Sequence, residues 1–105
     1  MIPLEKVKLI VNTYETLEKE LASGNIDKKD FVKKSKEYSS IGEVINQAKG
    51  YLNFEKEKIE LEKIIEDNGG DKEMSQLAKK ELNELLEKNK TNEKILKIYL
   101  LPKDE

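Results

Sequence analysis

Apolar side chains recur along this 105-residue chain at spacings of three, four and seven residues, which indicates amphipathic helices that share an apolar seam. Pro3 favours a first helical turn, and Ser23-Gly24 is typical of a helix C-terminus. Asn68-Gly69-Gly70 is the strongest turn signal, and Asp71 after it is a suitable helix cap. We therefore predict an all-α antiparallel bundle of three to four helices built around a long helical hairpin, with helices at about residues 3–22, 28–38, 41–67 and 72–98.

The second segment carries an apolar stripe with heptad spacing, which resembles a coiled-coil seam running to about Asp67. Ser39–Gly42 interrupts the stripe, and Ser40 with Glu43 matches a capping box. We therefore expect a short helix and a long helix to meet there, although the sequence leaves open whether the chain bends. The residues seven apart are Phe31, Tyr38, Ile45, Leu52 and Ile59.

The composition argues against several classes of function. The chain has neither histidine nor cysteine, which removes the usual base at neutral pH, thiolate nucleophiles, disulfides and zinc sites with N or S ligands. Acidic pairs such as Glu60 with Glu62 lie among lysines, so we interpret them as solvated surface. No stretch approaches the roughly 18 apolar residues of a membrane span. We expect no enzyme activity, no cofactor, no metal and no membrane partner for this chain.

Lysines are concentrated in one place, near the start of the second predicted helix. All 20 basic residues are lysines and the net charge is −2, so the chain as a whole is not drawn to nucleic acid. A local cluster, offset only by Asp30, is the one patch that could meet a phosphate backbone, although a solvated helix face is the simpler interpretation. The cluster consists of Lys28, Lys29, Lys33, Lys34 and Lys36.

Three stretches, taken in order, resemble one protein family. Ser35–Ser39 reads S-K-E-Y-S and resembles the motif S-K/R-E-Y/H-A/S. Asp71–Leu82 reads D-K-E-M-S-Q-L-A-K-K-E-L and resembles D-x-E-M-x-x-L/M-A-x-x-E-L. Leu100–Asp104 reads L-L-P-K-D, as at the close of that family's helical region. The chain is thus similar along its length to the start of the bacterial peptide chain release factor one family, the class I factors for UAA and UAG, rather than to the UGA-reading relatives.

The resemblance implies that residues 1–105 are the N-terminal helical domain of a longer protein, with residues 99–105 starting the connection to its central domains. It implies a cytoplasmic role in translation termination, with the Gly-Gly-Gln hydrolysis motif and the codon-reading motif lying further along the chain. Gly69-Gly70 is followed by Asp71 rather than glutamine, so no catalytic residue is expected here.

The implied partners are the stalk base of the large ribosomal subunit and the class II release-factor GTPase. We place the ribosome contact at the lysine cluster, and we do not expect the isolated domain to bind nucleic acid strongly. The alternative is a free-standing helical, coiled-coil-like interaction module, for which the coding sequence would stop at Glu105 instead of running on to Gly-Gly-Gln. The sequence does not decide whether the chain dimerises.

Overall fold

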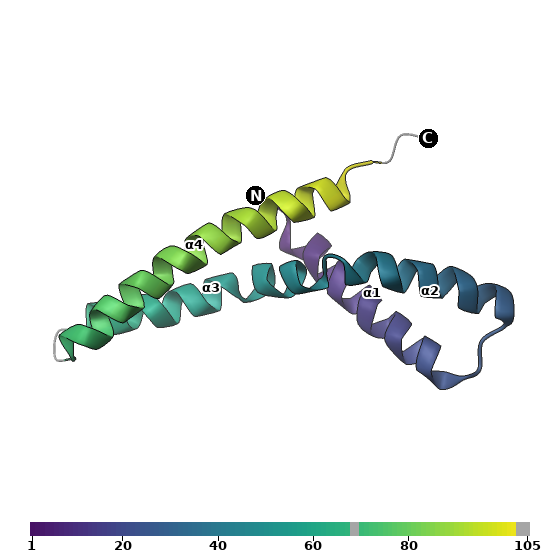
Figure 1. The fold of residues 1–105 in the computed structure, drawn as a ribbon, viewed down its shortest axis with the longest axis horizontal. Helices are drawn as coiled ribbons and strands as arrows, with labels where there is room; N and C mark the ends of the chain where they lie inside the picture. Colours follow the sequence, from purple (N-terminus) through teal and green to yellow (C-terminus); the bar gives the residue numbers. More distant parts are fainter. Residues whose placement is uncertain (68–69, 103–105) are drawn as a thin grey trace.

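Four helices form the chain in a computed structural model that describes residues 1–67 and 70–102 (Figure 1). No strand occurs within those two ranges, so the predicted all-α class is confirmed. The helices are α1 (Leu4–Ser23), α2 (Lys28–Gly42), α3 (Ile45–Glu66) and α4 (Lys72–Leu100).

Local chemistry sets the ends of α1. Pro3 lies at the N-cap, one residue before the helix, and its carbonyl accepts from the backbone N–H of Lys6 at 3.1 Å. Gly24 follows the last helical residue with φ of 74°, a left-handed conformation that an L side chain disfavours. The Ser23 hydroxyl donates to the Glu20 carbonyl at 2.7 Å and accepts from the Asn25 N–H at 3.2 Å. The chain therefore leaves α1 through a closed turn.

The helices α3 and α4 form the long hairpin that the sequence predicts. Asp71 caps α4, because its side chain accepts from the backbone N–H of Glu73 at 3.0 Å. The predicted turn at Asn68-Gly69-Gly70 lies partly outside the described residues; within them, the Gly70 N–H donates to the Asp67 carbonyl at 3.1 Å. With 22 and 29 residues, α3 and α4 are about 33 and 44 Å long.

The break between the second and third helices lies further along the chain than the sequence predicts. We expected them to meet between residues 38 and 41, but α2 continues to Gly42 and α3 begins at Ile45. The expected capping box is absent, because Ser40 lies inside α2 and its carbonyl accepts from the Glu43 N–H at 3.3 Å. Ile41 explains the difference: its side chain is 4% exposed, so burial against the core favours one more turn of helix over the local cap.

This break also divides the heptad stripe. Ile45 is buried and Tyr38 and Leu52 pack against the core, whereas Phe31 and Ile59 are each 48% exposed. The prediction that the seam runs to about Asp67 is therefore wrong, because its outer members are exposed. The stripe is divided between two helices, as expected, and these have different neighbours, since α2 packs mainly on α1 while α3 packs on α1 and α4.

A single core joins all four helices near the middle of the molecule. Val7 of α1 and Leu96 of α4 are completely buried in it. The α1–α2 hairpin and the free half of the α3–α4 hairpin extend from this core in different directions (Figure 1). The molecule measures 61 × 33 × 19 Å, and its radius of gyration of 18.4 Å exceeds the roughly 13 Å of a compact domain of this length. The other buried core residues are Ile2, Ile10, Leu17, Ile41, Val44, Ile45, Ala48 and Tyr51.

Candidate functional site

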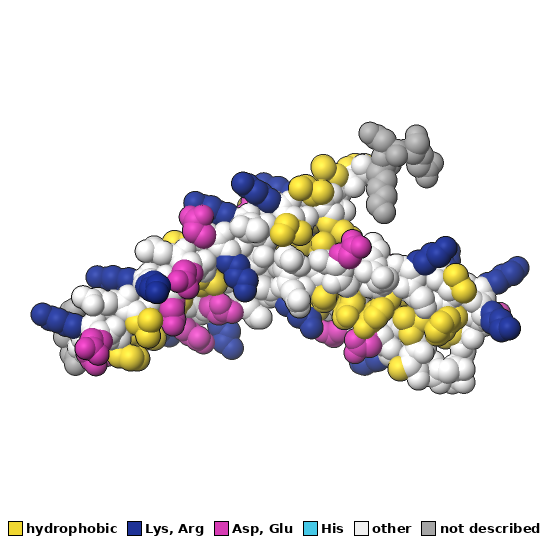
Figure 2. Space-filling model, viewed as in Figure 1, with side chains coloured by type: hydrophobic (Ala, Val, Ile, Leu, Met, Phe, Trp, Pro, Cys, Tyr) yellow, Lys and Arg dark blue, Asp and Glu magenta, His cyan; other side chains and the backbone are white. Residues whose placement is uncertain are grey.

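Four lysines of α2 point away from the rest of the bundle. Lys29, Lys33 and Lys36 lie at positions i, i+4 and i+7, which places them on one side of the helix. They and Lys28 are exposed, and none of the four has an ion pair with a residue in the ranges 1–67 and 70–102. Figure 2 shows lysine side chains projecting around the free end of the α1–α2 hairpin. We call these four residues the outer lysine face.

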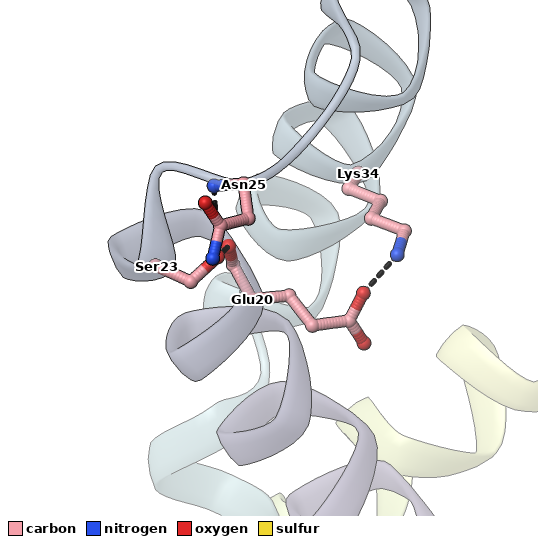
Figure 3. Close-up of polar contacts among 4 residues, drawn as sticks. All are labelled: Glu20, Ser23, Asn25 and Lys34. Atoms are coloured by element: carbon pink, nitrogen blue, oxygen red, sulfur yellow. Dashed lines mark hydrogen bonds and ion pairs between the residues drawn. The ribbon is translucent and has the colours of Figure 1, made fainter.

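Lys34 differs from the other members of the predicted cluster. Its ammonium group forms an ion pair with the Glu20 carboxylate of α1 (Figure 3). The Lys34 and Glu20 side chains are 35% and 36% exposed, so the pair is partly shielded from water. Lys34 therefore joins α2 to α1 and is not part of the outer lysine face.

Aromatic packing on the side of α2 that carries Lys34 supports the outward orientation of the outer lysine face. Tyr38 stacks on Tyr14 of α1, and its hydroxyl donates to the Glu18 carboxylate at 2.9 Å. The adjacent Tyr14 side chain and then the Glu18 carboxylate raise the pKa of Tyr38 above its ordinary value. Since Lys34 and Tyr38 both face α1, the outer lysine face is turned outward by packing on the opposite side of α2.

The turn between α1 and α2 carries carboxylates close to the lysines. Asp27 takes the N-cap position of α2 as expected, but its side chain makes no capping hydrogen bond. Asp27 and Asp30 line a shallow polar depression together with Glu20 and Lys34. Among the described residues, no group of three or more Asp or Glu side chains is arranged to hold a metal ion.

A second polar cluster fastens the start of the chain to α4. The Glu93 carboxylate lies 3.0 Å from Lys97 Nζ, as the i,i+4 spacing indicates, and 3.4 Å from the α-amino group of Met1. Hydrogen bonds from Lys97 and from that amino group lower the pKa of Glu93. The backbone N–H of Ile2 donates to the Tyr51 hydroxyl at 3.2 Å. Ile2 is thus part of the folded core, whereas the Met1 side chain is exposed and only its amino group contacts α4.

Sequence patterns did not reveal the partners of Lys34, Tyr38 and Met1. Glu20 and Lys34 are 14 residues apart, and Glu18 and Tyr38 are 20 apart, so their contacts depend on how α1 and α2 rotate against each other. The Met1 contact depends on where the first residues meet α4. By contrast, the pair of Glu93 with Lys97 lies within one helix and has a local i,i+4 signature.

Comparison with known proteins identifies the class to which this helical fold belongs. The family model described as PCRF domain matches residues 10–105. The chain therefore belongs to the PCRF-domain family, and the resemblance found in its motifs is confirmed. No solved structure is significantly similar to the chain.

The curated relatives are named peptide chain release factor 1. The protein of Pelagibacter ubique is 50% identical over the whole chain, which covers 29% of that relative. The protein of Bartonella quintana is 34% identical over 98% of the chain and 28% of the relative, and that of Chlorobaculum tepidum is 34% identical over 96% and 29%. The chain thus spans less than a third of the length of the relatives it matches. Within the described residues, no helix has the length and apolarity needed to cross a membrane.

Proposed function

We propose that this chain is a ribosome-contacting domain of a release factor that directs termination at UAA and UAG, and that it performs no chemistry itself. Membership of the PCRF-domain family supports the termination role, and the names of the relatives favour release factor 1. The outer lysine face is the observation that carries the contact proposal, because it concentrates positive charge on an outward side of one helix. The factor would act in the cytoplasm, where ribosomes terminate translation.

The residue inventory supports a non-catalytic role. Histidine and cysteine are both absent from the sequence. The acidic residues Glu60, Glu81 and Glu84 are exposed, and general acid–base catalysis needs carboxyl groups held in unlike environments within one cleft. We infer that hydrolysis of peptidyl-tRNA belongs to another part of the factor.

The geometry of the outer lysine face suits an extended, negatively charged partner. Lys29 and Lys36 are seven residues apart, which separates them by about 10 Å along the helix axis, so the face offers several charges along a line. We propose that it faces the stalk base of the large ribosomal subunit, and that the domain helps to place the class II release-factor GTPase. Since the net charge is −2, we expect the isolated domain to bind nucleic acid weakly.

A peptide-release assay tests the termination role. Ribosomes carrying UAA, UAG or UGA in the decoding site are mixed with the full-length gene product or with residues 1–105 alone. We expect release at UAA and UAG by the full-length product and none by the fragment. Release at UGA would contradict the codon assignment, and release by the fragment would contradict the non-catalytic role. A gene product ending at Glu105 would instead favour a free-standing interaction module.

A charge-reversal pair tests the contact. Lys29→Glu with Lys33→Glu in the full-length factor should weaken ribosome binding at low salt. A plot of log affinity against log salt has a negative slope, and the double variant should make this slope less steep by about two if both lysines contact phosphates. Lys90→Glu with Lys94→Glu is the matched control, because these α4 lysines are exposed and also four residues apart. Equal affinities for both double variants would remove the outer lysine face from the interface.

A further inference from the structure

Three residues that are unusual inside a packed helical hairpin meet at one level between α3 and α4. Asn92 of α4 is only 6% exposed, and Oδ1 of Asn89, nearly one turn earlier, is buried. Gly50 of α3 lies against them, since a Cβ atom at this position would be 3.0 Å from Asn92 Nδ2. A mid-helix glycine lowers helix stability relative to alanine, and buried amides require hydrogen-bond partners. Because all three residues meet at one level, we infer that this part of the α3–α4 hairpin needs them for a specific reason.

A small cavity accompanies this polar level. Its volume is about 40 Å³, and its lining includes Gly50 and Phe54 from α3 with Leu85, Asn89 and Asn92 from α4. By the same measure, a single water molecule needs at least about 10–15 Å³. The cavity is therefore large enough for water, and its wall has both polar and apolar parts.

The buried side-chain oxygen of Asn89 needs a hydrogen-bond donor. Its Oδ1 atom has no hydrogen-bond donor among the residues that the structure describes. A buried carbonyl oxygen is strongly destabilising without a donor, and protein interiors usually satisfy such atoms with an ordered water molecule. Asn92, one turn further along α4, offers an amide group on the same wall of the cavity.

We propose that the cavity is a binding site for an ordered water molecule that donates a hydrogen bond to Asn89 Oδ1 and accepts one from the Asn92 amide. Gly50 is then needed because a larger side chain would displace the Asn92 amide from this position. The water joins two asparagines of α4 at this level, whereas apolar side chains hold the hairpin at other levels. This hydrated level is distinct from the outer lysine face and independent of the proposed function.

The test compares crystal structures of the chain and of its Asn89→Leu variant at a resolution that shows ordered solvent. We expect water within hydrogen-bond distance of Asn89 Oδ1 in the wild type and its loss in the variant. Asn83→Leu is the matched control, because Asn83 is an exposed asparagine of the same helix, and it should keep the water. A protein donor to Asn89 Oδ1, or a dry cavity in the wild type, would overturn the proposal.

A solution measurement on the full-length gene product makes the test independent of crystals. In the wild type, nuclear Overhauser transfer between water and the Asn92 side-chain amide should have the sign of a bound water molecule. Asn89→Leu should abolish this transfer, and Asn83→Leu should retain it. Gly50→Ala provides a second variant if Asn89→Leu does not fold, and it should weaken the transfer by moving the Asn92 amide. Transfer that is absent from the wild type, or unchanged in both Asn89→Leu and Gly50→Ala, would contradict the site.

Discussion

The rings of Tyr14 on α1 and Tyr38 on α2 stack with their centroids 4.5 Å apart and their planes 14° from parallel. This contact lies one turn of α2 from the Lys34–Glu20 ion pair, so both hold the same side of α2 against α1. The stack therefore positions the outer lysine face without including any of its residues.

The raised pKa of Tyr38 makes the α1–α2 contact sensitive to alkaline pH. The protonated hydroxyl is favoured in the folded state, so its contribution to stability is complete below the ordinary pKa of 10.0 and is lost as pH rises through the folded value. Tyr38→Phe keeps the ring and removes the titration. Urea denaturation from pH 8 to 11 should therefore show the stability of the wild type falling toward that of Tyr38→Phe above about pH 10. A constant difference between the two proteins across this range would contradict the assignment.

The lowered pKa of Glu93 predicts the opposite pH dependence. Its ionised form is favoured in the folded state, so its contribution is complete above the ordinary value of 4.5 and is lost as pH falls through the folded value. The stability difference between the wild type and Glu93→Gln should therefore shrink below about pH 4.5, as measured by urea denaturation. Glu87→Gln is the control, because Glu87 pairs with Lys90 at 3.5 Å on an exposed surface and should have little effect at any pH.

Two glycines should respond oppositely to alanine. Gly24 has φ of 74°, so Gly24→Ala should lower the free energy of unfolding by about 1 kcal/mol, although its Cβ would meet no atom within 4 Å. Gly42 ends α2 without a positive φ, and its Cβ would lie 3.8 Å from Tyr14, an ordinary contact. Gly42→Ala should raise stability by up to about 1 kcal/mol. Thermal unfolding measures both, and equal signs would refute the backbone explanation.

The two aspartates at helix starts should differ in importance. Asp71→Ala removes the hydrogen bond to the Glu73 N–H and should cost about 1 kcal/mol. Asp27 occupies the corresponding position before α2 but makes no capping hydrogen bond, so Asp27→Ala should lose only a few tenths of a kcal/mol from the helix dipole. Chemical denaturation of the two variants compares them directly. A larger loss for Asp27→Ala would mean that its carboxylate caps α2 in solution.

The features that sequence analysis predicts well are those that neighbouring residues decide. Gly24 supplies the left-handed residue that closes α1, and Asp71 supplies an acceptor for the first turn of α4. The break after Gly42 was misplaced because the burial of Ile41, a tertiary effect, outweighs the local capping pattern at Ser40. Phe31 has an apolar side chain at a heptad position, yet it is 48% exposed, because heptad spacing alone does not fix which helix covers a residue.

The candidate site also contains features that neighbouring residues decide and features that depend on another helix. The exposure of Lys29, Lys33 and Lys36 follows from their spacing on one side of α2. The role of Lys34 depends on Glu20 from another helix, and no local pattern identifies such a pair. Any contact between the outer lysine face and the ribosome stays a prediction.

The elongated shape has a mechanical consequence for the domain. The α1–α2 hairpin packs on α3 through α1 and reaches α4 through the shared core, which includes Val7 and Leu96. A force applied at the lysine-bearing end would act through a long lever arm, and the core would bear the resulting torque. Since Val7 and Leu96 are completely buried there, close packing at this one region decides how far the two ends of the 61 Å molecule can move relative to each other.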